Sequence, residues 1–267
     1  MLDDKTFLDE ALKIVCEADR NDATLRIVGA LAVRLHCQDH EALHIGLKRL
    51  EDERSFTDID LAGYSKQKHT IRQVMEDRLG FKTSAQALLM RGRERLIYNH
   101  PQGLYQVDVF LDCLRFSHDV CFGSDPRKGR LGLDFPTITP TDILLCKIQI
   151  HDIAEKDVKD LLTILRAHDL SLEEAKDMIN TSYIASLLAE DWGFWYDSKA
   201  NLRKAASFAK DYHLKGMLTQ EDLADISIKI NRLISHIESQ PKTREWINQE
   251  RKGPGKKWWR DVEEVVR

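Results

Sequence analysis

Hydrophobic positions in the first third of the chain switch between helical and strand spacing. Apolar residues three and four apart predict amphipathic helices over 4–18 and 65–79. Between these helices, a short apolar run over 25–28 ends at Gly29, which predicts a buried strand followed directly by a new helix. Residues 58–63 alternate polar and apolar, the period of a strand with one buried face. The pattern therefore predicts strands interleaved with helices.

The middle of the chain has a period of two. Apolar residues alternate over 96–98 and 105–111, and the turn residues 101–103 between these segments predict a β-hairpin. Further short strands are expected near 116–121 and 130–135. We therefore expect several strands of one sheet in this part of the chain.

Beyond Pro136 the spacing is helical to the end of the chain. Thr139-Pro140 is typical of a helix start, because the N–H that proline lacks has no partner in the first turn of a helix. Further helices are expected over 155–167, 172–190, 199–212 and 219–239. Strands first and helices afterwards predict an α+β fold, with a mixed β-sheet flanked by helices over 1–168 and an α-helical C-terminal region over 169–267.

The composition is that of an ordinary globular protein. Of 267 residues, 42% are hydrophobic and 31% charged, which excludes global disorder. The 40 basic and 44 acidic residues give a net charge of −4, which excludes a polycationic mode of nucleic-acid binding but leaves local basic patches open. No apolar stretch approaches the ~20 residues of a membrane span. The acidic N-terminus is unlike a signal peptide, so we expect a cytoplasmic protein with no membrane association.

The cysteines show no pattern of a metal site. Their number is odd and no CxxC motif is present, which favours reduced thiols and argues against a zinc site. They are Cys16, Cys37, Cys113, Cys121 and Cys146.

Three aspartates on the predicted strands carry the clearest chemistry. Asp58 and Asp60 are two residues apart in a strand and share one face, and Asp108 lies opposite the apolar residues of its own strand. If these strands are neighbours, three carboxylates converge on one sheet surface and repel one another unless cations bind there. Carboxylate oxygens suit Mg²⁺, and such a cluster is typical of two-metal phosphoryl or nucleotidyl transfer. The alternative is a solvated Asp-x-Asp on an exposed strand, which is common.

A lysine lies on the apolar face of a predicted helix. Lys147 is four residues from Ile143 and three from Leu144, so it shares the face expected to be buried. One interpretation is a lysine whose stem lies along apolar surface while its ammonium reaches water. The other is a cation that pairs a triphosphate or the carboxylate cluster.

The order of these motifs resembles a known superfamily. The segments 27–33 (IVGALAV), 57–61 (TDIDL) and 106–110 (QVDVF) are similar to the motifs of the DNA polymerase β-type nucleotidyltransferase superfamily. Within it, the chain resembles the AbiEii-like proteins, several of which are toxins of bacterial toxin–antitoxin systems. The resemblance covers residues 20–170 and extends weakly through 191–195.

The resemblance implies a nucleotidyltransferase-fold sheet and an enzyme that moves an NMP from an NTP to a hydroxyl acceptor with Mg²⁺ or Mn²⁺. It implies that Asp58 and Asp60 bind both metals and that Asp108 binds the catalytic one. Gly29 and Ala30 would contact the nucleotide phosphates through backbone amides. Ala30 departs from the family pattern of Gly or Ser, so a hydroxyl contact is lost.

A second acidic pair follows the AbiEii-like pattern. Those proteins have a lysine at the place of Lys147, followed by a helix with Lys-Asp-x-x-Asp, here Lys156, Asp157 and Asp160. The resemblance implies that Lys147, Lys156 and Asp160 bind the nucleotide and that Asp157 is a base or orienting group for the acceptor. The alternative from the residues alone is a helix surface of mixed charge.

The end of the chain bears on the acceptor. Residues 241–267 hold eight Lys/Arg and five Asp/Glu, a charge of +3, and the basic run 252–260 includes Trp258 and Trp259. Such a segment favours RNA, such as tRNA, over a protein acceptor, and a toxin role would add an antitoxin protein as partner. Alternatively, the tryptophans anchor the last helix. A rival function, to which Ala30 points, is a catalytically degenerate fold that binds a nucleotide or a protein.

Overall fold

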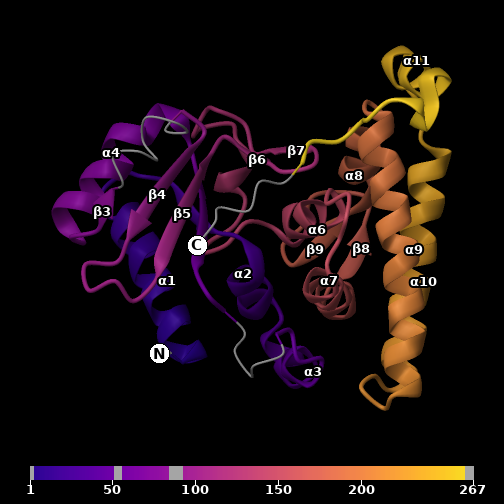
Figure 1. Ribbon diagram of the computed structural model, residues 1–267, viewed down its shortest axis with the longest axis horizontal. Helices are drawn as coiled ribbons and strands as arrows, with labels where there is room; N and C mark the ends of the chain where they lie inside the picture. Colours follow the sequence, from indigo (N-terminus) through magenta and orange to yellow (C-terminus); the bar gives the residue numbers. More distant parts are fainter. Residues whose placement is uncertain (1–2, 51–55, 84–92, 262–267) are drawn as a thin grey trace. The chain divides into compact units, whose positions relative to one another are not determined.

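The computed structural model describes residues 3–50, 56–83 and 93–261 (Figure 1). Two compact units make up the chain, and each is treated by itself. The first, the sheet unit, comprises Met1–His36, Leu50–Leu114 and Cys121–Thr139. The second, the helical unit, comprises Cys37–Arg49, Arg115–Val120 and Pro140–Arg267.

A five-stranded mixed sheet forms the centre of the sheet unit, in the order β1-β2-β5-β4-β3. Its strands are β1 (Leu25–Ile27), β2 (Ile59–Gly63), β3 (Lys82–Thr83), β4 (Arg95–Asn99) and β5 (Gln106–Leu111). β2 and β5 pair in parallel, and all other neighbours pair antiparallel. The strand over residues 58–63 and the hairpin over 96–111 are therefore confirmed, and they supply the two strands that carry the aspartates.

Helices pack on this sheet. Asp3 caps the first of them by accepting a hydrogen bond from the backbone N–H of Thr6 at 2.7 Å. α1 packs against β1 and α2 against β2. The helical segments are α1 (Asp4–Asp19), α2 (Gly29–His36), η2 (Ser65–Gln67), α4 (Lys68–Arg72), the π-helical turn η3 (Gln73–Arg78) and η4 (Arg130–Gly132). The helix expected over 65–79 is thus three successive helical segments.

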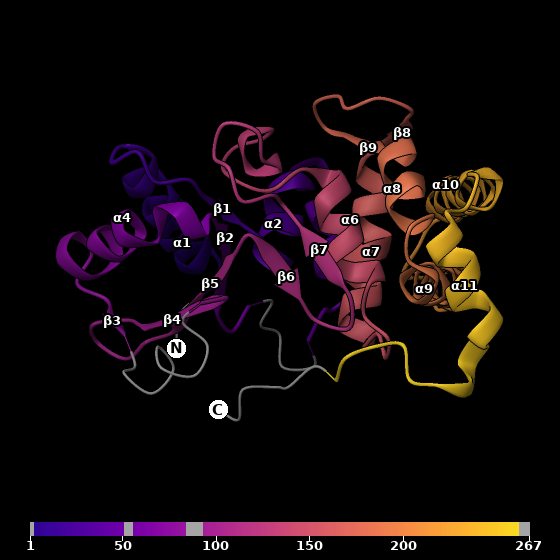
Figure 2. The ribbon, with the colours of Figure 1, turned by 90° about the horizontal axis from the view of Figure 1, so that it is seen from above.

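Helices dominate the helical unit, where α9 and α10 lie side by side (Figure 2). α10 begins at a reciprocal capping box between Thr219 and Asp222. The segments are η1 (Gln38–His40), α3 (Glu41–Gly46), α6 (Pro140–Ile148), α7 (Glu155–Ala167), α8 (Thr181–Leu188), α9 (Trp192–Leu214), α10 (Gln220–Ser239), α11 (Arg244–Lys252) and η5 (Gly253–Gly255). The α+β class with a helical C-terminal region is confirmed.

Some expected elements are wrong. Residues 130–135 form η4 and a loop instead of a strand. The helix expected over 172–190 exists only as α8, because residues 169–171 and 178–180 pair in parallel as β8 (Asp169–Ser171) and β9 (Met178–Asn180). Asp177 has a φ of +56°, which a right-handed helix does not allow. A domain boundary after residue 168 stays a prediction.

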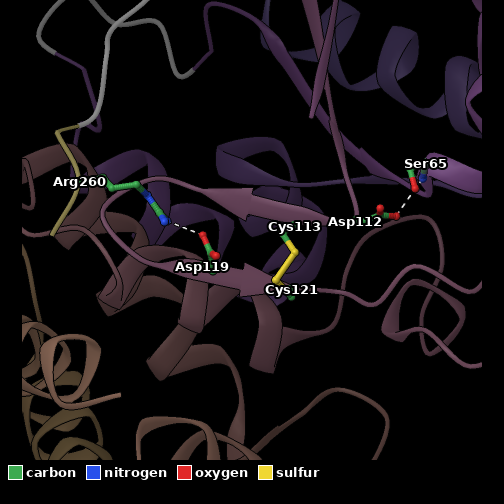
Figure 3. The surroundings of a disulfide bond; sticks show 6 residues. All are labelled: Ser65, Asp112, Cys113, Asp119, Cys121 and Arg260. Carbon is green, nitrogen blue, oxygen red and sulfur yellow. Dashed lines mark hydrogen bonds and ion pairs between the residues drawn. A yellow bond between two sulfur atoms is a disulfide. The ribbon is translucent and has the colours of Figure 1, made fainter. Parts of the chain in front are cut away.

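A disulfide closes the hairpin of β6 (Cys113–Arg115) and β7 (Asp119–Cys121) (Figure 3). The two strands place the Cα atoms of Cys113 and Cys121 4.0 Å apart, and their sulfur atoms are bonded. The expectation that all five cysteines are reduced is therefore wrong, since antiparallel pairing joins two cysteines that are eight residues apart. No helix among the described residues is long and apolar enough to cross a membrane.

Candidate metal and nucleotide site

Three carboxylates meet at the start of the parallel strand pair. Asp60 of β2 and Asp108 of β5 are register partners, and Asp58 directly precedes β2. Oxygen atoms of all three side chains lie within 4.8 Å of one another. The structure therefore brings together the residues that the strand spacing predicted, and their role as metal ligands stays a prediction.

The strand period explains this convergence. Ile59 and Leu61 flank Asp60 on β2 and are completely buried on the opposite face. Asp108 is itself buried, whereas Asp58 and Asp60 are partly exposed. The cluster thus has one carboxylate inside the protein and two that reach its surface, an arrangement open to an ion from solvent.

The first residue of α2 lies directly against the cluster. Gly29 has a φ of +69°, and a Cβ atom there would lie 3.1 Å from Oδ2 of Asp60. The N–H of Val28 donates a hydrogen bond of 2.9 Å to the carbonyl oxygen of Asp60, which fixes this approach. Ala30 follows in the first turn of α2 and is partly exposed. Amide groups at a helix start favour anions, so phosphate groups suit this position.

Sequence reasoning missed Arg95, which forms an ion pair inside the cluster. Nη2 of Arg95 donates to Oδ2 of Asp108 at 2.5 Å. Arg95 is the register partner of Phe110, so its side chain reaches Asp108 diagonally across β4 and β5, with its guanidinium carbon 4.9 Å from the centre of the Phe110 ring. No local signal marks Arg95, because the contact depends on the strand register.

The donor set fits a hard divalent cation. Three carboxylates and one guanidinium leave the group formed by Asp58, Asp60, Asp108 and Arg95 with an excess of negative charge. Mg²⁺ and Mn²⁺ prefer oxygen ligands of this kind, and the close approach of like charges makes a cation favourable. The residues present therefore fit the metals that the motif predicts.

The second predicted group lies in the helical unit, where Lys147 pairs with both aspartates of α7. Its Nζ is 2.7 Å from Oδ1 of Asp157 and 2.7 Å from Oδ2 of Asp160. Asp160 also accepts hydrogen bonds from Arg49 Nε at 3.0 Å and His44 Nε2 at 3.2 Å. Sequence reasoning did not connect these last two residues with Asp160, because they come from a segment more than 100 positions away.

Ion pairing outweighs burial in setting the charges of this group. Burial alone would raise the pKa of the Asp160 carboxyl, but attraction to Lys147 and Arg49, with the hydrogen bond from His44, holds it well below its usual value. Burial would lower the pKa of Lys147, but Asp157 and Asp160 raise it above the ordinary value. The pair is therefore ionised, and the interpretations as a solvent-reaching lysine and as an exposed mixed-charge surface are wrong for Lys147 and Asp160. Lys156 is exposed.

The tryptophans of the basic segment are packed on the helical unit. Nε1 of Trp258 lies 3.3 Å from both carboxylate oxygens of Asp197, and Trp259 stacks on His151 with 3.6 Å between ring centres. Asp197 also receives His118 Nε2 at 2.8 Å and His151 Nδ1 at 2.9 Å. This packing agrees with the anchoring alternative, except that the tryptophans follow α11, the last described α-helix, and attach the segment after it.

Comparison with known proteins gives little to set beside this geometry. No protein-family model and no curated protein matches the sequence. One solved structure with some likeness is the solution structure of the antibiotic-resistance factor ANT(2'')-Ia, at 14% sequence identity. The match covers 79% of this chain and 98% of that chain, with a TM-score of 0.38. Membership of the AbiEii-like proteins stays a prediction.

Proposed function

We propose that the protein is a nucleotidyltransferase that depends on Mg²⁺ or Mn²⁺ and moves an NMP from an NTP to a hydroxyl acceptor. The observation that carries this proposal is the approach of Asp58, Asp60 and Asp108 to within 4.8 Å of one another on paired parallel strands. Gly29 places the start of α2 beside the same carboxylates. A cluster of carboxylates next to a helix start, where backbone amides favour anions, suits a metal-bound triphosphate.

Each residue has a distinct part in this reaction. Asp58 and Asp60 would hold both cations and Asp108 the one on the acceptor side; bound cations would supply charge stabilisation and make the acceptor hydroxyl more acidic. Backbone amides of Gly29 and Ala30 would orient the phosphates. The acceptor hydroxyl would give its proton to a base, for which Asp157 is the candidate, and its oxygen would form a bond to the α-phosphorus. The bond between the α-phosphorus and the oxygen that bridges to the β-phosphate would break, and pyrophosphate would leave with the electron pair.

The residues of α6 and α7 divide into two groups in this proposal. Lys156 is exposed and Asp157 is partly exposed, so these two are the candidates for direct contact with nucleotide or acceptor. Lys147 and Asp160 are buried against each other and would act by positioning Asp157, since Lys147 holds both carboxylates. Under this division Asp157 keeps its proposed role as base or orienting group.

The proposed acceptor is an RNA, such as tRNA, in preference to a protein. Support comes from the net charge of +3 over residues 241–267 and from the exposure of Lys256 and Lys257 within the basic segment. Trp258 and Trp259 pack against Trp192 and His151, which leaves their rings less available for stacking on bases, so the phosphate backbone is the part of RNA that this segment suits best. The resemblance to the AbiEii-like proteins also supports a role as a toxin with a protein antitoxin, and we include this role in the proposal.

Two observations favour the degenerate alternative. Arg95 already pairs with Asp108, and Ala30 lacks the hydroxyl that the family uses. A protein that binds nucleotide without transfer would need no free metal ligand at Asp108.

The test separates enzyme from binding module. The protein is incubated with each α-labelled NTP, Mg²⁺ or Mn²⁺ and a cell extract, and labelled species are treated with ribonuclease or protease. We expect ribonuclease-sensitive label that is lost with Asp58→Asn/Asp60→Asn and kept with Asp77→Asn, an exposed aspartate of the same unit. Nucleotide binding without transfer of label would favour the degenerate alternative, and protease-sensitive label would identify a protein acceptor.

A further inference from the structure

We propose that Arg95 is a built-in counter-ion that occupies the carboxylate cluster in the absence of metal and that an incoming cation must displace from Asp108. The inference rests on the proposed function and concerns the regulation of the same site. It assigns Arg95 the task of setting how tightly the cluster binds a divalent ion.

The carboxylate cluster brings three acidic groups close together. Carboxylate oxygens of Asp58, Asp60 and Asp108 lie within 4.8 Å of one another, so the ionised groups repel when no cation is bound. Asp108 is the most buried of the three, and a charge withdrawn from water is the one that most needs a partner. Arg95 supplies that partner at 2.5 Å.

The carboxylate of Asp108 would serve two functions. Oδ2 of Asp108 is the atom that accepts from Arg95, and Asp108 is also the member of the cluster that the motif assigns to the catalytic metal. A guanidinium at this distance and a divalent cation on the same carboxylate repel each other. Metal binding and the Arg95–Asp108 ion pair therefore compete.

Arg95 is not completely buried. Its side chain is 16% exposed, so part of it reaches the protein surface. The ring of Phe110 lies beside the guanidinium carbon at 4.9 Å and holds the side chain in place by a cation–π contact. Arg95 is thus held by two contacts. A bound metal would compete for the Asp108 carboxylate but would not affect the contact with the Phe110 ring.

Direct metal binding tests the inference. The Kd for Mn²⁺ is measured by electron paramagnetic resonance on the wild type, Arg95→Gln and Arg93→Gln, the last an exposed arginine two residues away that makes the same charge change. We expect Arg95→Gln to bind Mn²⁺ roughly tenfold more tightly, because like charges a few ångströms apart near a protein surface repel strongly. Arg93→Gln should stay within about twofold of the wild type, because exposed charges are screened.

A second variant covers the case in which Arg95→Gln fails to fold. Phe110→Leu keeps every charge and an apolar side chain but removes the ring beside the guanidinium. It should loosen Arg95 and tighten Mn²⁺ binding in the same direction. Thermal unfolding supplies an independent readout: Arg95→Gln should melt below the wild type without metal and gain more from saturating Mn²⁺ than the wild type gains.

The outcomes distinguish the two proposals. Unchanged or weaker Mn²⁺ binding in both Arg95→Gln and Phe110→Leu overturns the inference, while a wild type that binds Mn²⁺ and transfers label keeps the proposed function. A wild type that binds Mn²⁺ no better than Asp58→Asn/Asp60→Asn overturns both.

Discussion

Nζ of Lys147 on α6 lies 2.7 Å from Oδ2 of Asp160 on α7, and both side chains are withdrawn from water. Arg49 and His44 complete the surroundings of Asp160. Because each charge has a partner, the group joins two helices and the η1–α3 segment of the helical unit without leaving an unpaired ion inside. The residues assigned to nucleotide binding are therefore also part of the core of this unit.

Removal of the Lys147 ammonium should lower the free energy of unfolding. In Lys147→Met, Asp157 and Asp160 lose their shared cation inside the protein, and breaking a buried pair in this way costs about 3–5 kcal/mol. Lys156→Met, a neighbouring exposed lysine, should change the free energy of unfolding by less than about 0.5 kcal/mol. Urea unfolding measures both values, and equal effects of the two variants would contradict the buried pair.

The pH dependence of stability follows from the same carboxylate. The pKa of Asp160 is depressed in the folded protein and about 3.9 when unfolded. Its contribution is therefore present above the unfolded pKa and is lost as the pH falls through the folded one. The raised pKa of Lys147 matters at alkaline pH. Its contribution to the free energy of unfolding is fully present below the unfolded pKa of about 10.4 and is lost as the pH rises through the folded pKa.

We expect the free energy of unfolding to decrease as the pH is lowered below about 4. Unfolding then leads to uptake of up to one proton by Asp160, which contributes a slope of up to about 1.4 kcal/mol per pH unit. Asp160→Asn lowers the stability at neutral pH but removes this part of the slope. Urea titrations between pH 3 and 7 compare the slopes. Parallel curves for the wild type and Asp160→Asn would show that the folded and unfolded pKa values of Asp160 are the same.

Local patterns were enough to find the three clustered aspartates. The period of two around Asp58, Asp60 and Asp108 places each on the face opposite buried apolar residues, and only the pairing of the two strands had to be assumed. Arg95 could not be found this way. Its contact with Asp108 depends on the register of β4 against β5, which no residue next to Arg95 encodes.

Tertiary pairing also explains the errors. Leu170 and Ile179 belong to β8 and β9, and their apolar spacing with neighbouring residues imitates a helix until the two short strands pair. Cys113 and Cys121 stand too far apart for any short cysteine motif and are joined by a hairpin turn. Composition and spacing alone therefore favoured reduced cysteines, whereas the fold joins Cys113 and Cys121 in a disulfide.

Thiol titration tests the disulfide. Unfolded and unreduced protein should show three thiols, Cys16, Cys37 and Cys146, and five after reduction. In the native state only the partly exposed Cys16 should react readily, because burial raises the pKa of Cys37 to about 12 and also raises that of Cys146. Cys113→Ser/Cys121→Ser should lower the free energy of unfolding by about 2–3 kcal/mol, because the unfolded chain gains entropy when the loop is no longer closed. Five thiols before reduction would exclude the bond.

Gly29 should tolerate no side chain. Gly29→Ala forces a Cβ to within 3.1 Å of Oδ2 of Asp60 and keeps a φ of +69°, at a cost of about 1–2 kcal/mol. The displaced carboxylate should also weaken Mn²⁺ binding. Gly132→Ala, where a Cβ meets nothing within 4 Å, is the matched control in the same unit. Wild-type Mn²⁺ affinity in Gly29→Ala would show that Asp60 adjusts without loss.

The C-terminal segment, residues 253–261, passes over the start of α9. A Cβ on Gly193 would lie 2.8 Å from Cδ1 of Trp258 and 3.2 Å from its backbone oxygen, so the segment passes too close for any larger residue. Arg260 continues this contact, since its N–H donates to the carbonyl of Ser117 at 3.1 Å and its guanidinium pairs with Asp119 (Figure 3). The segment is thus attached at several points along its length.

Gly193→Ala should push Trp258 away from Asp197 and cost about 1–3 kcal/mol, as overpacking does elsewhere. Gly255→Ala lies in the same segment, three residues before Trp258, and its Cβ would meet nothing within 4 Å, so it should behave like the wild type. Limited trypsin digestion at Lys256 and Lys257 reports the release, because cleavage needs a segment that detaches. Faster cleavage in Gly193→Ala alone would confirm that Gly193 is small because the segment rests on it, and equal rates in all three proteins would contradict the attachment.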